Sequence, residues 1–238
     1  MTNKKILWVT GFNKDYFNYV FKKTQSSWSL IPDDVVFLLD ENILELSKDA
    51  KSIIIDMKDL KVPKTISGNE IKFWKKSRSI VYALEKFKKN YDYLIWLDSD
   101  ISILKTPDTK LFLPNEEELL SVANKIVNYD KTIDKFQNPY LVDLGLDTGF
   151  IAFNLKFKHF ENWLQEYKNF WETDEINQFV RKYDTYVLDR IIETNGYNYR
   201  NLWLGQHTKG KYYCGFEDTI LEDYFYHYWG RKQKDNLK

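Results

Sequence analysis

The sequence predicts an α/β fold in which helices flank a mixed, mainly parallel, Rossmann-like sheet. The main observation is that short apolar runs alternate with segments of helical spacing, an order typical of parallel sheets. The second is the length of 238 residues, which suits one such domain over residues 1–238. Apolar residues make up 43% and charged residues 29%, a balance typical of globular proteins.

The first half of the chain, about residues 1–105, contains the regular part of this pattern. Its apolar runs predict strands, and its segments of helical periodicity predict helices between them. The expected strands are Lys5–Thr10, Asp34–Leu39, Ser52–Ile55 and Tyr91–Leu97, and the expected helices are Asp15–Ser27 and Asn69–Phe87, with Asn69 as the N-cap. We expect this half to bind a nucleotide.

The second half, about residues 106–238, is less regular. Prolines interrupt residues 106–144, and short aromatic-rich segments follow the helices. The expected elements are a strand at Phe150–Phe153, helices at Phe157–Phe170 and Glu175–Thr194, and strand-like segments at Tyr197–Leu204, Lys211–Phe216 and Asp223–Trp229. Gly196 is the expected stop of the second helix. We expect this half to be the variable part of the domain.

Charge and cysteine content narrow the class of protein. Lysine plus arginine and aspartate plus glutamate both number 35, so the net charge is zero, which argues against nucleic acid as a partner. The single cysteine, Cys214, fits a reducing compartment. No apolar run is long enough for a secretory signal or a transmembrane segment. We therefore expect a cytoplasmic protein, and attachment to a membrane surface stays open.

Two acidic residues follow the last strand of the first half. Asp98 and Asp100 come directly after Tyr91–Leu97. Ligands of parallel sheets bind beyond the carboxyl ends of the strands. Two carboxylates at such an end can hold Mg²⁺ or Mn²⁺ that bridges a diphosphate. The alternative is a solvated acidic pair at a strand-to-turn junction.

Four segments, in order, resemble the GT-A glycosyltransferases, and the C-terminal one resembles the glycogenin and bacterial galactosyltransferase type. They are spread along the chain between Phe73 and Lys234: the basic helix FWKKSRSIVYAL (Phe73–Leu84), the metal-binding segment YDYLIWLDSDISIL (Tyr91–Leu104), the donor-side strand LDTGFIAFN (Leu146–Asn154) and the ending YFYHYWGRKQK (Tyr224–Lys234). The resemblance departs from the family at Asp147, where a small polar residue is usual, and at Gln233, where a lysine is usual.

The resemblance implies that the second half of the chain binds the acceptor of the sugar. It also implies a site made of three groups of residues. Asp98, Asp100 and His227 hold Mn²⁺ or Mg²⁺, and this oxygen and nitrogen donor set suits Mn²⁺. The residues that bind the nucleotide sugar are Thr10, Gly11, Asp40, Lys75, Arg78, Ser99, Gly230 and Lys232, with Lys76 competing with its neighbours in the basic helix. Asp184 and Asp147 are the catalytic candidates, with Asp189 as the rival of Asp184.

Each of these residues also has a simpler interpretation. His227 fits a core histidine among aromatic side chains, and Asp40 fits a helix N-cap. Asp184 fits a salt bridge with Arg181 or Lys182. Lys232 fits a solvated charged tail.

The implied function is a metal-dependent transfer of a hexose from a nucleotide-diphosphate sugar, with UDP as the expected nucleotide, to a hydroxyl of a glycan, a lipid-linked glycan or a protein. The C-terminal segment favours retention of configuration, whereas inversion requires one carboxylate as a base. Two alternatives stay open. A haloacid dehalogenase-type phosphatase also carries D-x-D after a strand, and a non-catalytic sugar-binding module shares the aromatic content, which is 17% here.

Overall fold

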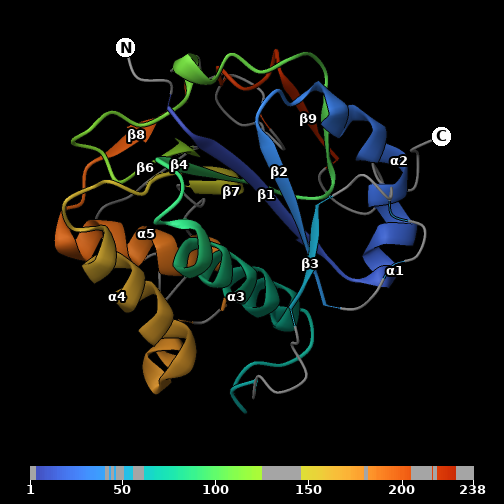
Figure 1. Cartoon of the computed structure of the whole chain (residues 1–238). Coiled ribbons are helices and arrows are strands. Elements are labelled where there is room, and N and C mark those ends of the chain that lie inside the picture. The colour runs from blue at the N-terminus through green and yellow to red at the C-terminus, as the bar shows by residue number, and fades with distance from the viewer. Residues whose placement is uncertain are drawn as a thin grey trace.

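A seven-stranded sheet forms the centre of the molecule in a computed structural model (Figure 1). The structure describes residues 4–40, 43, 46, 51–55, 62–124, 146–179, 182–204, 216 and 219–228. The strand order is β3-β2-β1-β4-β7-β6-β8. The strands are β1 (Ile6–Phe12), β2 (Asp34–Leu39), β3 (Ser52–Ile54), β4 (Tyr93–Leu97), β6 (Leu120–Asn124), β7 (Leu146–Asn154) and β8 (Tyr199–Asn201).

The sheet is mixed and mainly parallel, as the sequence predicts. Strands β1 to β4 pair in parallel, and β8 is parallel to β6. Strand β7 is antiparallel to both β4 and β6. A separate two-stranded sheet pairs β5 (Ile101–Ile103) with β9 (Phe225–His227) in antiparallel register. This small sheet brings the C-terminal segment beside the acidic pair.

Three helices cover one face of the large sheet. Figure 1 shows α3 (Glu70–Phe87), α4 (Phe160–Glu172) and α5 (Asp184–Asn195) packed together beneath it. Successive side chains of a strand point to opposite faces. Leu94 and Trp96 of β4 accordingly pack toward these helices, whereas Ile95 and Leu97 pack into the core on the other face.

An irregular helical segment, Lys14–Leu30, packs on that other face. It begins with α1 (Lys14–Tyr16), continues through a π-helical turn at Phe17–Phe21 and α2 (Lys22–Thr24), and ends in the 3₁₀ segment Gln25–Leu30. The side chains of Phe17, Phe21 and Trp28 are buried against the sheet. The sequence predicts one regular helix here. The aromatic side chains are buried as that periodicity requires, but the backbone hydrogen bonding changes along the segment.

Other differences lie in the second half. The expected helix Glu175–Thr194 is two elements, a 3₁₀ turn at Asp174–Gln178 and α5, because Phe179 and Tyr183 between them adopt extended backbone angles. Strands β5 and β6 were not predicted. Asn69 precedes α3, but its side chain makes no capping hydrogen bond. Gly196 ends α5 with φ 62°, as predicted. The expected strand Lys211–Phe216 lies outside the described residues except for Phe216.

Candidate functional site

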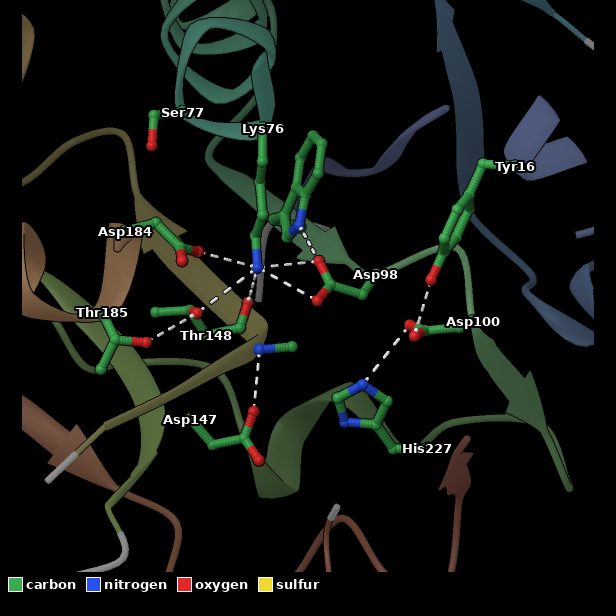
Figure 2. A network of polar contacts seen from close by, with 12 residues as sticks. Tyr16, Lys76, Ser77, Asp98, Asp100, Asp147, Thr148, Asp184, Thr185 and His227 are labelled. Atoms are coloured by element: carbon green, nitrogen blue, oxygen red, sulfur yellow. Dashed lines mark hydrogen bonds and ion pairs between the residues drawn. The ribbon is translucent and has the colours of Figure 1, made fainter. Parts of the chain in front are cut away.

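The registers of the two sheets bring Asp98, Asp100 and His227 together. Asp98 follows β4, and its N–H donates to Gly149 O at 2.8 Å, so the ladder with β7 continues one residue further. Asp100 precedes β5, whose first residue, Ile101, lies opposite His227 on β9. One ligand atom from each of Asp98, Asp100 and His227 lies within 4.8 Å of the others (Figure 2).

Asp100 and His227 are both buried, and they face one another. His227 Nε2 lies 3.4 Å from Asp100 Oδ1. Burial lowers the pKa of His227, but the charge of Asp100 and its hydrogen bond outweigh burial and hold that pKa above its usual value. The imidazole packs against Phe216, as a core histidine would. Its Nδ1, however, has no hydrogen-bond partner among the described residues, so the imidazole is not a fully satisfied core group.

Gly149 makes room for this imidazole. A Cβ at position 149 would lie 2.7 Å from His227 Cε1 and 3.0 Å from His227 Nδ1. Real Cβ atoms do not approach so closely, so His227 rests directly on the backbone of β7. The glycine in the middle of a buried strand therefore serves close packing, which is a recognised use of glycine in strands.

Asp98 is held by two donors. Trp96 Nε1 donates to Asp98 Oδ1 at 2.8 Å, and Lys76 Nζ lies 2.9 Å from the same oxygen. Burial raises the pKa of Asp98 above its usual value, although the charge of Lys76 acts in the opposite direction. Since Asp100 is buried and Asp98 is mostly buried and paired, the interpretation of these residues as a solvated acidic pair is wrong.

Lys76 lies at the centre of the polar network. Its ammonium is 2.9 Å from Asp98 Oδ1, 2.9 Å from Asp184 Oδ2 and 2.8 Å from Thr148 O (Figure 2). Asp98 Oδ2 and the Thr148 hydroxyl lie slightly further away, at 3.1 and 3.4 Å. An ammonium group has three donors, and residues Asp98, Asp184 and Thr148 all offer acceptors to this one. Burial lowers the pKa of Lys76, but the charges of Asp184 and Asp98 raise it above its usual value, so the side chain stays protonated.

Asp184 is the first residue of α5, and its side chain is 2% exposed. The partial positive charge of a helix N-terminus favours a carboxylate there. The sequence suggested a salt bridge with Arg181 or Lys182, but the partner is Lys76. The ammonium of Lys182 instead lies 3.9 Å from Glu70, and Arg181 lies outside the described residues.

The other acidic candidates differ in exposure. Asp147, on β7, is half-buried, and its Oδ1 accepts a hydrogen bond from Gly149 N–H at 2.9 Å. The charge of Asp147 also contributes to the raised pKa of His227, so Asp147 interacts electrostatically with the cluster of Asp98, Asp100 and His227. Asp189 is buried on α5, one turn beyond Asp184.

The carboxyl ends of β1 and β2 carry unsatisfied polar atoms. Thr10 is fully buried, and its hydroxyl has no partner among the described residues. Asp40 accepts a hydrogen bond from Lys75 at 2.8 Å through Oδ2, while its buried Oδ1 has no partner within the described part of the chain. At Gly11, a Cβ would lie 3.1 Å from Trp96 Cη2. This edge therefore offers unused acceptors where a ligand of a parallel sheet binds.

The other residues predicted to bind the nucleotide sugar are not part of this edge, or they lie outside the described residues. Arg78 forms an ion pair with Glu172 of α4. Ser99 is buried, and its carbonyl accepts a hydrogen bond from Thr24 Oγ1. Gly230 and Lys232 lie outside the described residues.

Several residues of the network were not predicted as members of the site. They are Tyr16, Trp96, Thr148 and Gly149, with Thr185, whose hydroxyl lies 3.2 Å from that of Thr148. Two had a signal in the sequence. Trp96 is two residues before Asp98 and so points to the same face of the strand, and a glycine inside a buried strand indicates close packing.

Comparison with solved structures identifies the fold. Over 98% of both chains, this protein is similar to a glycosyltransferase involved in the glycosylation of the major capsid of PBCV-1, with a TM-score of 0.57 and 15% identity. The WbbM bifunctional glycosyltransferase matches 97% of this chain and 47% of its own, with a TM-score of 0.57 and 12% identity. Mouse xyloside xylosyltransferase 1 matches over 84% and 85%, with a TM-score of 0.50 and 16% identity.

The fold is GT-A. No protein-family model and no curated protein sequence matches the chain. In this GT-A fold, the acidic pair follows β4 at the carboxyl edge of the parallel strands, which is where the sequence places it. Within the described residues, no helix is both long enough and apolar enough to cross a membrane.

The donor set of the cluster fits a divalent cation. Two carboxylates and one imidazole offer oxygen and nitrogen ligands, a combination that suits Mn²⁺ and is compatible with Mg²⁺. The imidazole also retains a buried nitrogen, Nδ1, without a partner among the described residues. Asp98, Asp100 and His227 are therefore a candidate metal centre.

Proposed function

We propose that this protein is a metal-dependent glycosyltransferase that moves a hexose from a UDP-sugar to a hydroxyl acceptor in the cytoplasm. The observation that carries the proposal is the cluster of Asp98, Asp100 and His227, which lies at the carboxyl edge of a GT-A sheet beside the buried Lys76. The structurally similar proteins named above are glycosyltransferases, which favours sugar transfer over the phosphatase interpretation.

Asp98, Asp100 and His227 would hold Mn²⁺ or Mg²⁺. When bound, such an ion neutralises the charge that develops on a diphosphate leaving group. The protein must keep these three side chains in place. Lys76 orients Asp98, since its ammonium ties that carboxylate to Asp184 and to the backbone of β7.

The nucleoside is assigned to the carboxyl ends of β1 and β2. Thr10 and Asp40 supply unused polar atoms there, and Lys75 orients Asp40. Gly11 makes room for the indole of Trp96 beneath this edge. The uracil N3–H and the ribose hydroxyls are hydrogen-bond donors, and a carboxylate such as Asp40 can accept hydrogen bonds from them.

The diphosphate is assigned to residues beside Asp98 and Asp100 and, by resemblance, to residues of the C-terminal segment. Ser99, Gly230 and Lys232 are the residues proposed to contact it, with the resemblance of the C-terminal segment as support. Among the basic residues of α3, Lys76 is the one that meets Asp98, whereas Lys75 and Arg78 pair with Asp40 and Glu172. Lys76 is therefore proposed as the cation that faces the donor side of the metal centre.

Asp147 and Asp184 receive different roles. Asp184 is buried and paired with Lys76, so it acts through that ammonium. Asp147 is half-buried beside the cluster and is proposed to contact a donor hydroxyl or the acceptor. Because Asp184 is engaged by Lys76, it is a poor candidate for the base that inversion requires. Asp147 is the remaining candidate for such a base, whereas the C-terminal resemblance favours retention of configuration. Proton NMR of the released or transferred sugar tests which configuration is formed.

Donor hydrolysis tests the function without knowledge of the acceptor. The purified chain is incubated with Mn²⁺ and a panel of UDP-hexoses, and UDP release is measured. We expect one donor to be hydrolysed slowly in the presence of Mn²⁺, and Asp100→Asn to lower the rate by about 100-fold, since loss of metal-assisted charge neutralisation costs several kcal/mol.

The matched control is Asp223→Asn. Asp223 is an exposed acidic residue that pairs with Lys105, outside the network described above. We expect this variant to keep the wild-type rate. Binding of a UDP-sugar without any hydrolysis would support the sugar-binding module instead, and absence of both binding and hydrolysis with every donor would refute the proposal.

A further inference from the structure

Residues 98–100 connect β4 to β5 and contain Asp98 and Asp100, and we call them the acidic loop. The helical segment Lys14–Leu30 contacts this loop and the strand after it in three places. Each contact joins a hydroxyl group of the segment to one residue of the loop or to the strand that follows it. The three are Tyr16 OH to Asp100 Oδ2 at 2.9 Å, Thr24 Oγ1 to Ser99 O at 3.3 Å, and Ile103 N–H to Ser27 Oγ at 3.0 Å. The shape of the acidic loop is thus fixed from outside the loop.

The π-helical turn explains how Tyr16 joins this set. A regular α-helix returns to the same face after about seven residues, and a π turn adds one residue. Tyr16 and Thr24 are eight positions apart with the π turn at Phe17–Phe21 between them, so both meet the acidic loop. Single π turns within helices are frequent at functional sites.

The two oxygens of Asp100 have different surroundings. Oδ2 accepts the hydrogen bond of the Tyr16 hydroxyl, and Oδ1 faces Nε2 of His227 at 3.4 Å (Figure 2). A phenol is protonated at neutral pH and donates one hydrogen.

We propose that Tyr16 is a positioning residue of the metal centre, whose hydroxyl occupies Asp100 Oδ2 and leaves Oδ1 as the oxygen presented to a divalent cation. This inference rests on the proposed function, since it concerns the same metal centre. Tyr16 does not touch the cation; it acts through Asp100.

The physical reason lies in the freedom of a carboxylate. Without the Tyr16 hydroxyl, the buried Oδ2 loses a donor that lies 2.9 Å away, and the orientation of the carboxylate is held less firmly. Rotation moves Oδ1 away from the position shared with His227 and Asp98. Loss of hydrogen bonds to metal ligands typically weakens metal binding by about 10- to 100-fold.

Mn²⁺ binding to the full chain tests the proposal. The dissociation constant is measured by electron paramagnetic resonance from the signal of free Mn²⁺, with and without UDP, for the wild type, Tyr16→Phe and Tyr19→Phe. Tyr19 belongs to the same helical segment and is 37% exposed, so its variant controls for loss of a tyrosine hydroxyl there. We expect Tyr16→Phe to weaken binding by about 10-fold or more, and Tyr19→Phe to leave it unchanged.

A second measurement separates positioning from simple loss of structure. The melting temperature is recorded without metal and with saturating Mn²⁺. We expect Tyr16→Phe to melt at a lower temperature than the wild type without metal, because the buried Asp100 loses a hydrogen bond. Beyond that loss, we expect a smaller metal-induced increase than in the wild type, because ligand binding stabilises the folded state by mass action.

The outcomes distinguish this inference from the proposed function. If the wild type binds Mn²⁺ and Tyr16→Phe binds it equally well, the positioning role is wrong while the metal centre stands. If the wild type binds neither Mn²⁺ nor Mg²⁺ with or without UDP, both the metal-dependent function and the positioning role fall.

Discussion

Lys76 and Asp184 form a buried ion pair that joins α3 to the first residue of α5. The two atoms lie 2.9 Å apart, and the side chains are 14% and 2% exposed. Asp184 Oδ2 has no other partner among the described residues. An isolated buried charge is costly, whereas a paired one is tolerated. Each side chain of this pair therefore depends on the other.

Lys76→Met should destabilise the protein by about 3–5 kcal/mol, because it leaves Asp184 buried without its counter-charge. Urea unfolding followed by circular dichroism measures the change in the free energy of unfolding. Since Lys76 also orients Asp98, the same variant should lose most of its Mn²⁺-dependent donor hydrolysis.

Lys75→Met is the matched control on the same helix. Lys75 is 40% exposed and pairs with Asp40, so its loss should cost less than about 1 kcal/mol. The double variant Lys76→Met with Asp184→Asn should be less destabilised than the sum of the two single changes, since the pair is coupled. A cost for Lys76→Met no larger than that of Lys75→Met would contradict the assignment of a buried pair.

The fold of the first half and the acidic pair of the candidate metal site follow from local features of the sequence. The strands of the first half are continuous apolar runs, which is how strands buried on both faces present themselves. Asp98 and Asp100 mark the end of one such run, and the C-terminal resemblance points to His227. Asp98 and Asp100 lie at the end of β4 because they directly follow its apolar run. His227 reaches them because β9 pairs with β5.

Which basic residue of α3 reaches Asp98 depends on how that helix packs against the sheet. Lys75, Lys76 and Arg78 are all basic, and successive helical residues point about 100° apart. Only Lys76 precedes the buried Ile80 by four positions and the buried Ala83 by seven, which places it on the inner face. That spacing was visible in the sequence. Tyr16, in contrast, reaches Asp100 through a contact between distant segments and an irregular helix, which no local pattern records.

Gly149→Ala should weaken Mn²⁺ binding by about 10-fold or more. The new Cβ would lie 2.7 Å from His227 Cε1, so the imidazole has to leave its place over β7. Isothermal titration with Mn²⁺ measures the effect. Gly196→Ala is the control: φ at that position is +62° and nothing lies within 4 Å, so it should cost about 1 kcal/mol of stability and leave metal binding intact. Equal metal affinity in the two variants would argue against His227 as a ligand.

Asp40→Asn should weaken UDP binding by about 10-fold without changing the affinity for Mn²⁺, since a hydrogen bond to a charged group contributes about 1.5–3 kcal/mol. Asp40 Oδ1 is buried without a partner among the described residues, at the edge assigned to the nucleoside. Competition by unlabelled UDP against a fluorescent nucleotide measures the change. Asp34→Asn, at the opposite end of β2, removes an exposed acid paired with Lys51 and should leave UDP binding as it is. Equal loss in both variants would point to a general electrostatic effect.

Mn²⁺ binding should weaken as the pH falls from about 8 to about 6, because a metal-bound imidazole must be neutral. Burial by itself lowers the pKa of His227, but Asp100 raises it above the usual value, so protons compete with the metal at a higher pH than for an ordinary histidine. Below that pKa, the dissociation constant should rise by up to about tenfold per pH unit. His227→Gln should bind Mn²⁺ weakly and with a much flatter pH dependence in the same titrations. A wild-type dissociation constant that is constant over this range would mean that His227 does not ligate the cation, and the metal centre would then consist of Asp98 and Asp100 alone.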